Sequence, residues 1–243
     1  MAEARAPVIL IAGGSGMRKR KGPDPLLRAV IDRTGIRQPT IAYVGAASGD
    51  DPAFRLWFAG LFQKAGAGEV TPVPLCGRRG DPRKAKAVLE ASDLVFISGG
   101  DVEEGMKVLM EKEMTDFLRR LHRSGKLFFG TSAGAIMLSS KWVRWRNPDD
   151  DRTAELFPCL GMASILCDTH GEGDGWEELK ALLALSPAGT VGYGIVMGTA
   201  VVAEPDGALS ALGGEVDRFQ KEADGVIQIE SLVPGRRGTG ELE

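Results

Sequence analysis

The sequence predicts an α/β fold: a doubly wound, mostly parallel sheet with helices on both faces and a C-terminal β-rich extension. Short apolar runs alternate with longer amphipathic segments, which is the pattern of strands connected by helices. The apolar runs lack a polar face, as strands covered on both sides require. A chain of 243 residues is long enough to bury one such core. We therefore expect residues 1–243 to form a single hydrolytic α/β domain, with 235–243 as a flexible tail.

The predicted elements follow from the positions of these runs and of glycine and proline between them. Strands are expected at 7–12, 40–45, 70–74, 94–98, 127–130 and 164–168. Helices are expected at 24–34, 51–65, 82–91, 102–122, 132–140 and 174–185. Beyond residue 185 the pattern changes to short strands at 190–195, 200–203, 208–212 and 226–229. Pro205-Asp206-Gly207 predicts a hairpin turn between two of them.

Composition limits the class of function. The formal charge of −3 argues against nucleic-acid binding by bulk charge. No run approaches the roughly 18 apolar residues of a membrane span, and residues 1–6 are too polar for a signal peptide. Three scattered cysteines fit neither a disulfide scaffold nor a zinc site, and Cys167 is expected to be buried in its strand. We expect a cytoplasmic enzyme without metal or cofactor, with no nucleic-acid or membrane partner, as a monomer or a homodimer.

Ser132 is the most informative residue. It lies in Gly130-Thr131-Ser132-Ala133-Gly134, the G-x-S-x-G frame of a nucleophile elbow. A strand turns sharply into a helix at such a serine, and the flanking glycines avoid clashes at the turn. The preceding apolar run and the following helix-forming residues fit this context, so Ser132 is the candidate nucleophile.

A serine nucleophile needs a base, and the chain has only two histidines. His122 ends a charged amphipathic segment, which predicts a solvated cation at a helix C-terminus. His170 ends an apolar strand and precedes glycine, at the carboxyl end where catalytic groups gather in α/β proteins. His170 is therefore the candidate base.

A third element follows the strand at 94–98. Gly99-Gly100 at its end lets backbone amides approach a ligand closely. One interpretation is an ordinary turn between a strand and a helix. The other makes the N–H groups of Gly100 and Ala133 an oxyanion hole.

These elements together resemble peptidase family S51, which includes dipeptidase E and cyanophycinase. The resemblance rests on Ser98-Gly99-Gly100-Asp101, Gly130 to Ala135, Asp168-Thr169-His170, Gly192 to Ala200 and the opening Ile11-Ala12-Gly13-Gly14. It spans about residues 7 to 230. It implies a class I glutamine amidotransferase-like fold, with Ser132 as nucleophile, His170 as base and short peptides as substrates. Another acyl or amide hydrolase and an inactive ligand-binding relative are the alternatives.

Two positions depart from the cyanophycinase pattern. The acid that supports the histidine in cyanophycinases corresponds here to the segment Ile195-Val196-Met197. The arginines that follow the histidine there are replaced by the acidic segment Gly171 to Glu178, which argues against cyanophycin as the substrate.

The acid of the triad must then come from elsewhere. Glu172 stands two residues after His170, as the acid does in the related amidotransferase fold, and we expect it to orient the imidazole. The rival is the run Asp149, Asp150 and Asp151, since dipeptidase E takes its acid from a loop about this far beyond the nucleophile. Asp168 is a third option.

Trp142-Val143-Arg144-Trp145-Arg146 directly follows the predicted elbow helix. One interpretation is packing, with surface arginines. The other is a pocket wall in which Arg144 and Arg146 hold a substrate carboxylate, and Asp101 joins them in the expected substrate site. The basic run Arg18 to Lys21 lacks the spacing of a nucleotide fingerprint, so we expect a solvated rim rather than a phosphate site.

Overall fold

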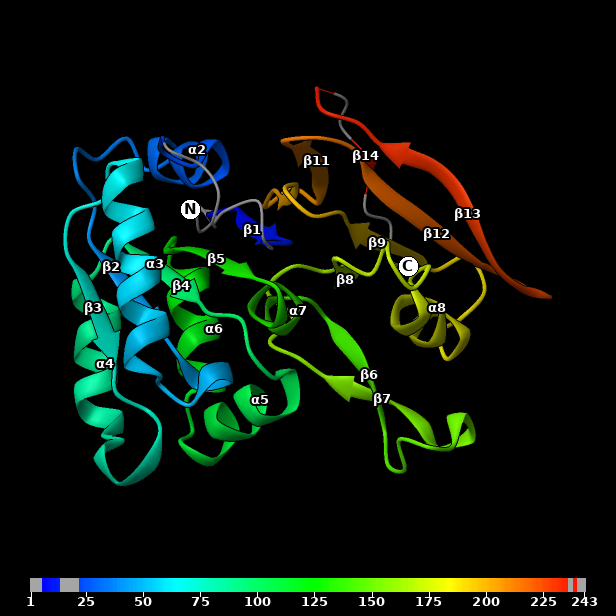
Figure 1. Ribbon diagram of the computed structural model, residues 1–243, viewed down its shortest axis with the longest axis horizontal. Helices are drawn as coiled ribbons and strands as arrows, with labels where there is room; N and C mark the ends of the chain where they lie inside the picture. Colours follow the sequence, from blue (N-terminus) through cyan, green and yellow to red (C-terminus); the bar gives the residue numbers. More distant parts are fainter. Residues whose placement is uncertain (1–5, 14–21, 236–237, 240–243) are drawn as a thin grey trace.

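The computed structural model describes residues 6–13, 22–235 and 238–239, and it confirms the predicted α/β fold (Figure 1). The main sheet has the order β14-β11-β10-β1-β5-β4-β2-β3. Its parallel strands are β1 (Val8–Ile11), β2 (Ile41–Val44), β3 (Val70–Val73), β4 (Leu94–Ile97) and β5 (Leu127–Thr131). Antiparallel strands β10 (Ala200–Ala203), β11 (Ala208–Leu212) and β14 (Gly238–Thr239) extend one side. The parallel strands end at one edge, so the loops that follow them meet there.

Helices cover both faces of this sheet. Side chains of α2 (Pro25–Asp32) and α3 (Pro52–Ala65) pack with Ile9, Ile11 and Phe96 on one face. The opposite face packs against α4 (Pro82–Ala91), α5 (Val102–Glu111), α6 (Thr115–Arg123) and α7 (Ala133–Leu138). Alternate residues of each strand serve the two layers, which explains why these strands are apolar throughout.

Three of these helices begin with the same two residues, aspartate and then proline. The side chains of Asp24, Asp51 and Asp81 accept hydrogen bonds from backbone amides of the first helical turn. The proline that follows each aspartate has no N–H to leave unpaired there and already has a helical φ. These local signals explain why α2, α3 and α4 begin within one residue of their predicted starts.

The single helix predicted at 102–122 is wrong, because two helices occupy this segment. Glu113 adopts a left-handed backbone conformation with φ 54°, which ends α5. The amides of Glu113 and Met114 donate to the carbonyls of Met110 and Leu109, at 3.0 Å and 2.8 Å. This is the Schellman arrangement, and it turns the chain so that Met114 is fully buried.

The strand predicted at 164–168 does not join the main sheet. Instead β8 (Leu166–Thr169) is the edge of a separate sheet of order β13-β12-β9-β8, with β9 (Val191–Ile195), β12 (Val216–Glu222) and β13 (Gly225–Leu232). Helix α8 (Glu177–Ala184) packs against this sheet through Leu179, Leu182 and Leu183 (Figure 1). The C-terminal extension is therefore divided, with β10, β11 and β14 in the main sheet and β9, β12 and β13 in the second.

A hairpin of β6 (Lys141–Trp145) and β7 (Ala154–Pro158) separates α7 from β8. Short 3-10 helices lie at Ala46–Ser48 (η1), Gly77–Arg79 (η2) and Asp151–Thr153 (η3). The turn predicted at 205–207 is confirmed, since it joins antiparallel β10 and β11 with φ 84° at Gly207.

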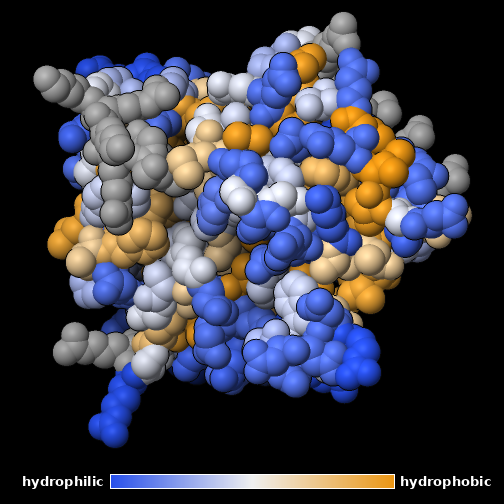
Figure 2. Space-filling view, turned by 45° about the vertical axis from the view of Figure 1, so that its right-hand side comes forward, coloured by the Kyte–Doolittle hydropathy of each residue, from blue (hydrophilic) through white to orange (hydrophobic). Residues whose placement is uncertain are grey.

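Within the segment 235–243, which was expected to be a flexible tail, Gly238 and Thr239 pair with β11. The rest of that tail beyond Gly235 lies outside the described residues, as does the basic run Arg18 to Lys21. In Figure 2 hydrophilic side chains dominate the lower part of the visible face, and apolar ones gather toward its right-hand side. Large exposed apolar side chains come from several elements and include Ile36, Leu56, Met110, Leu185, Met197 and Ile227.

Candidate active site

The elbow is present at Ser132, between β5 and α7. Ser132 has φ 53° and ψ −126°, a strained conformation for a residue with a side chain. A Cβ on Gly134 would lie 2.1 Å from the carbonyl oxygen of Ile97, and one on Gly130 would lie 2.5 Å from that of Gly134. Both glycines are therefore required for β4, β5 and α7 to pack closely enough to form this turn.

His170 reaches the elbow from the second sheet. It follows β8 with φ 47°, and its amide donates to the carbonyl of Ile195 on β9 at 2.9 Å. Its Nε2 lies 2.9 Å from Ser132 Oγ. Ser132 is half-buried and His170 is exposed, so a substrate can approach both. The structure thus brings together the two residues that the sequence singled out, from elements in different sheets.

The second ring nitrogen of His170 has no carboxylate hydrogen-bonded to it within the described part of the chain. Glu172, the expected acid, accepts instead from the amide of Met197 at 3.2 Å. The rival aspartates belong to the loop of the β6–β7 hairpin. Asp150 caps η3 and binds Arg152, and that guanidinium lowers the pKa of Asp150. Among the described residues, therefore, neither Glu172 nor the run Asp149 to Asp151 is hydrogen-bonded to the imidazole.

Two further carboxyl groups, those of Asp168 and Glu178, interact electrostatically with each other. Burial, together with the charges of Glu178 and Asp174, raises the pKa of Asp168 to about 7, although the hydrogen bond from the Thr169 amide opposes the rise. Burial and the charge of Asp174 raise the pKa of Glu178, while the charge of His170 lowers it. Glu178 therefore interacts electrostatically with the imidazole, although it lies eight residues beyond His170. The sequence offers no motif that singles it out, because paired glutamates are common in the first turn of a helix.

The remaining predicted residues lie in elements around the elbow. Gly100 is in the turn between β4 and α5, and Ala133 is the first residue of α7. Asp101 caps α5, where its side chain accepts from the Glu104 amide at 2.9 Å. Arg144 and Arg146 lie on β6 and at its end, and both contact Glu155 on β7, at 2.7 Å and 3.3 Å.

Arg144 also lies 3.8 Å from Glu103 on α5 and over the ring of Phe157. Its charge is thus already balanced within the protein. The alternative in which these arginines take part in packing is well supported for Arg144.

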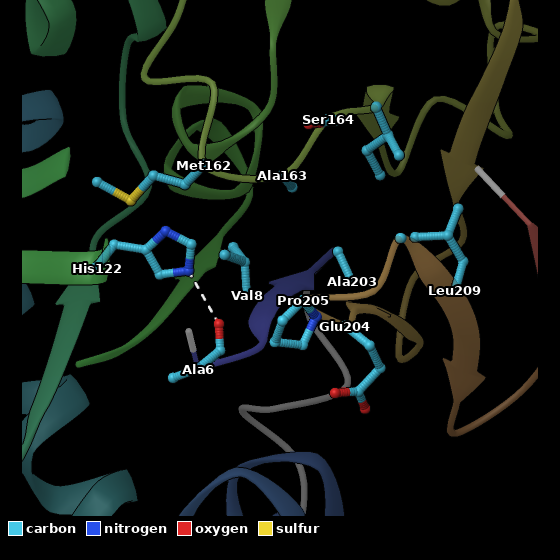
Figure 3. Close-up of a pocket in the computed structure, with 12 residues that line it drawn as sticks. Ala6, Val8, His122, Met162, Ala163, Ser164, Ala203, Glu204, Pro205 and Leu209 are labelled. Carbon is cyan, nitrogen blue, oxygen red and sulfur yellow. Dashed lines mark hydrogen bonds between the residues drawn. The ribbon is translucent and has the colours of Figure 1, made fainter. Parts of the chain in front are cut away.

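The other histidine is not the solvated cation that the sequence predicts. His122 is only 7% exposed, its Nε2 lies 2.9 Å from the Ala6 carbonyl oxygen, and its ring packs edge-on to Phe128. It lines a cavity with Val8, Met162 and Glu204 (Figure 3). Because Val8 begins β1 whereas Ser132 follows the end of β5, this cavity lies at the opposite edge of the sheet. The prediction failed because the charged residues around His122 face solvent while the imidazole points inward.

A serine at a strand–turn–helix elbow with a histidine within hydrogen-bond reach is the arrangement that serine hydrolases share. The model of peptidase family S51 matches residues 9–210, and the chain belongs to this family. The family and its peptidase members support an enzyme of the serine peptidase class.

Individual proteins are similar to this chain in sequence or in fold. A cyanophycinase from Nostoc sp. (strain PCC 7120) is 27% identical over 218 residues, covering 87% of this chain and 72% of the relative. The pyridoxal 5'-phosphate synthase subunit PdxT of Geobacillus stearothermophilus is 23% identical over 150 residues, covering 62% of this chain and 71% of the subunit. The crystal structure of a peptidase from an acI-B1 Actinobacterium shares the fold, with a TM-score of 0.74, 16% identity and 98% of both chains covered. No helix in the described ranges has the length and apolar character needed to cross a membrane.

Proposed function

We propose that this protein hydrolyses peptide bonds of short peptides through an acyl-enzyme on Ser132. The observation that carries the proposal is the 2.9 Å approach of His170 Nε2 to Ser132 Oγ at a strained elbow. Family membership supports peptides rather than other acyl compounds as the substrate class.

In the proposed reaction, Ser132 Oγ attacks the scissile carbonyl carbon while His170 Nε2 takes the hydroxyl proton. The carbonyl oxygen becomes an oxyanion, and the N–H groups of Gly100 and Ala133 stabilise it. Collapse breaks the C–N bond, and His170 returns the proton to the leaving amine. Water then attacks the acyl-enzyme by the same route and releases Ser132.

The acid of the triad stays a proposal at Glu172, and Glu178 joins it as a candidate. Glu172 lies two residues after the base, but one of its carboxylate oxygens accepts a hydrogen bond from the Met197 amide. Glu178 interacts electrostatically with His170. Of the two arginines expected to hold a substrate carboxylate, Arg146 is the better candidate. Its side chain is 73% exposed against 37% for Arg144, and it contacts only Glu155 among charged groups of the described residues.

The test combines labelling with digestion. A fluorophosphonate probe should label the wild-type protein at Ser132 and leave Ser132→Ala unlabelled. A peptide library digested by the wild-type protein and analysed by mass spectrometry should then give cleavage products that Ser132→Ala does not produce. Turnover of esters without peptides would favour a different acyl hydrolase, and absence of labelling would favour an inactive relative.

A further inference from the structure

The turn Ser98 to Asp101 lies directly against the nucleophile. A Cβ built on Gly99 would be 3.3 Å from Ser132 Cβ and 3.8 Å from Ser132 Oγ. The backbone of Gly99 therefore forms one wall of the space in which a carbonyl would be attacked. Any side chain at this position would intrude on the serine.

The far end of this turn is fixed to η1. The Asp101 amide donates to the carbonyl of Ala47 at 2.9 Å, and a Cβ on Gly100 would lie 1.9 Å from that same oxygen. Gly100 has φ 141°, which residues with side chains rarely adopt. With both ends held, the remaining freedom is the orientation of the Gly99–Gly100 peptide plane, because glycine tolerates either rotation.

The hydroxyl of Ser98 acts on that peptide plane. Ser98 is fully buried, its amide donates to the Val44 carbonyl at 3.0 Å, and its Oγ donates to the Gly99 carbonyl at 3.2 Å. Ser48 Oγ lies 3.2 Å from Ser98 Oγ. Ser48 Oγ also lies 3.1 Å from the Gly45 carbonyl oxygen, to which it can donate instead. Each serine hydroxyl carries one hydrogen, so when Ser48 donates to Ser98 the Ser98 hydrogen is left for the Gly99 carbonyl.

We infer that Ser98 is a positioning residue that aims the Gly100 N–H at the oxyanion. In a planar trans peptide the C=O and the N–H point in opposite directions. Holding the Gly99 oxygen on the Ser98 side therefore directs the Gly100 N–H to the other side. This inference rests on the proposed function, since it requires an oxyanion to form at Ser132.

The first experiment compares Ser98→Ala with the wild-type enzyme on a cleaved peptide. Because the oxyanion exists only in the transition state, kcat should fall about tenfold or more while KM stays within about twofold, less than the 100- to 1,000-fold loss of a whole oxyanion donor. A peptidyl trifluoromethyl ketone provides a second readout. Its carbonyl carbon bonds to Ser132 Oγ as His170 takes the proton, and the hemiketal oxyanion occupies the same hole. Its inhibition constant should rise by the same factor as kcat falls.

Three further variants separate this role from a structural one. Ser98→Thr keeps the hydroxyl and should restore kcat to within about threefold of wild type. Ser92→Ala is the matched control, because it removes the hydroxyl of another buried serine, which donates to the Val88 carbonyl at 2.9 Å just before the start of β4, whereas Ser98 follows the end of that strand. It should leave both constants within about twofold. Ser98→Cys nearly preserves the volume and should give an intermediate kcat, which covers the case that Ser98→Ala does not fold.

Unchanged kcat and inhibitor binding in Ser98→Ala or Ser98→Cys overturns the inference. So does a loss that appears only in KM, or one that Ser92→Ala reproduces. Failure of the proposed function looks different: the wild-type protein then cleaves no peptide, or Ser132→Ala retains the cleavage.

Discussion

At the residue scale, the proposed chemistry depends on two residues whose backbones have positive φ. Ser132 and His170 have φ of 53° and 47°. Such conformations cost about 1–3 kcal/mol each and persist where the surrounding structure enforces them. Here the close contacts at Gly134 and the hydrogen bond to Ile195 provide that enforcement.

The Ser132–His170 pair should behave as one catalytic unit. Ser132→Ala and His170→Ala should each lower kcat/KM by several orders of magnitude, and the double variant should be little worse than either. His122→Ala is a control for general loss of an imidazole, because His122 lies at the opposite edge of the sheet. It should retain specific activity once folded, although loss of a buried side chain should lower its Tm. More than about a tenth of wild-type activity in Ser132→Ala would remove that residue from the role.

The two candidate acids give a second residue-scale prediction. Glutamine at 172 keeps an oxygen for the Met197 amide, so Glu172→Gln separates that contact from a triad role. A change in kcat/KM of no more than about threefold would remove Glu172 from the triad. Glu178→Gln removes a carboxyl group that interacts electrostatically with His170, so kcat should fall about threefold to tenfold. Initial rates from pH 5 to 9 measure both. A loss of about 100-fold or more in Glu172→Gln would instead make Glu172 the triad acid.

At the element scale, helix ends decide where the chain turns. Three helices start at an aspartate followed by proline, and α5 stops at a non-glycine residue in the left-handed region. The helix starts at aspartate–proline can be predicted from the sequence. The end of α5 cannot, because Glu113 is a good helix former and the chain leaves the helix there to bury Met114.

Replacement of Glu113 by glycine tests that explanation. Glu113 is exposed, and glycine tolerates its φ of 54°, so Glu113→Gly should raise the free energy of unfolding by about 1 kcal/mol. Glu111→Gly is the matched control, since Glu111 is exposed but helical, and it should be destabilised by about 0.5–1 kcal/mol. Urea unfolding measures both, and a lower stability of Glu113→Gly would contradict the account.

At the scale of the whole molecule, the second sheet carries the base and a buried carboxyl group beside it. Asp168 on β8 is 6% exposed and interacts electrostatically with Asp174 and Glu178. Glu178 in turn interacts with His170. The folded-state pKa of Asp168, about 7, lies above the ordinary value of 3.8, so the folded protein binds more protons than the unfolded chain between these values. Its contribution to stability is therefore complete below about pH 4 and is lost as the pH rises through about 7.

Asp168→Asn should remove that dependence while keeping an oxygen for the Thr169 amide. Its free energy of unfolding relative to wild type should rise between pH 5 and pH 8 by up to a few kcal/mol, at about 1.4 kcal/mol per pKa unit. Asp206→Asn, at an exposed turn, is the control and should show no such trend. Urea titrations at the two pH values provide the measurement. Parallel behaviour of Asp168→Asn and wild type would show that the buried carboxyl group is not the cause.

The sequence by itself determined the fold class, most element positions, the elbow and the choice of His170 over His122. These depend on local patterns: apolar periodicity, glycine at close contacts, and a histidine at a strand end. Only the tertiary structure placed β8 in a second sheet, divided the C-terminal strands between two sheets and coupled Glu178 electrostatically to His170. Only the tertiary structure shows that the His122 side chain is buried and that Glu172 accepts a hydrogen bond from the Met197 amide. These strand pairings and side-chain contacts join residues that are far apart in the chain. Their free energy depends on which surfaces meet after folding, and a local sequence pattern does not contain that information.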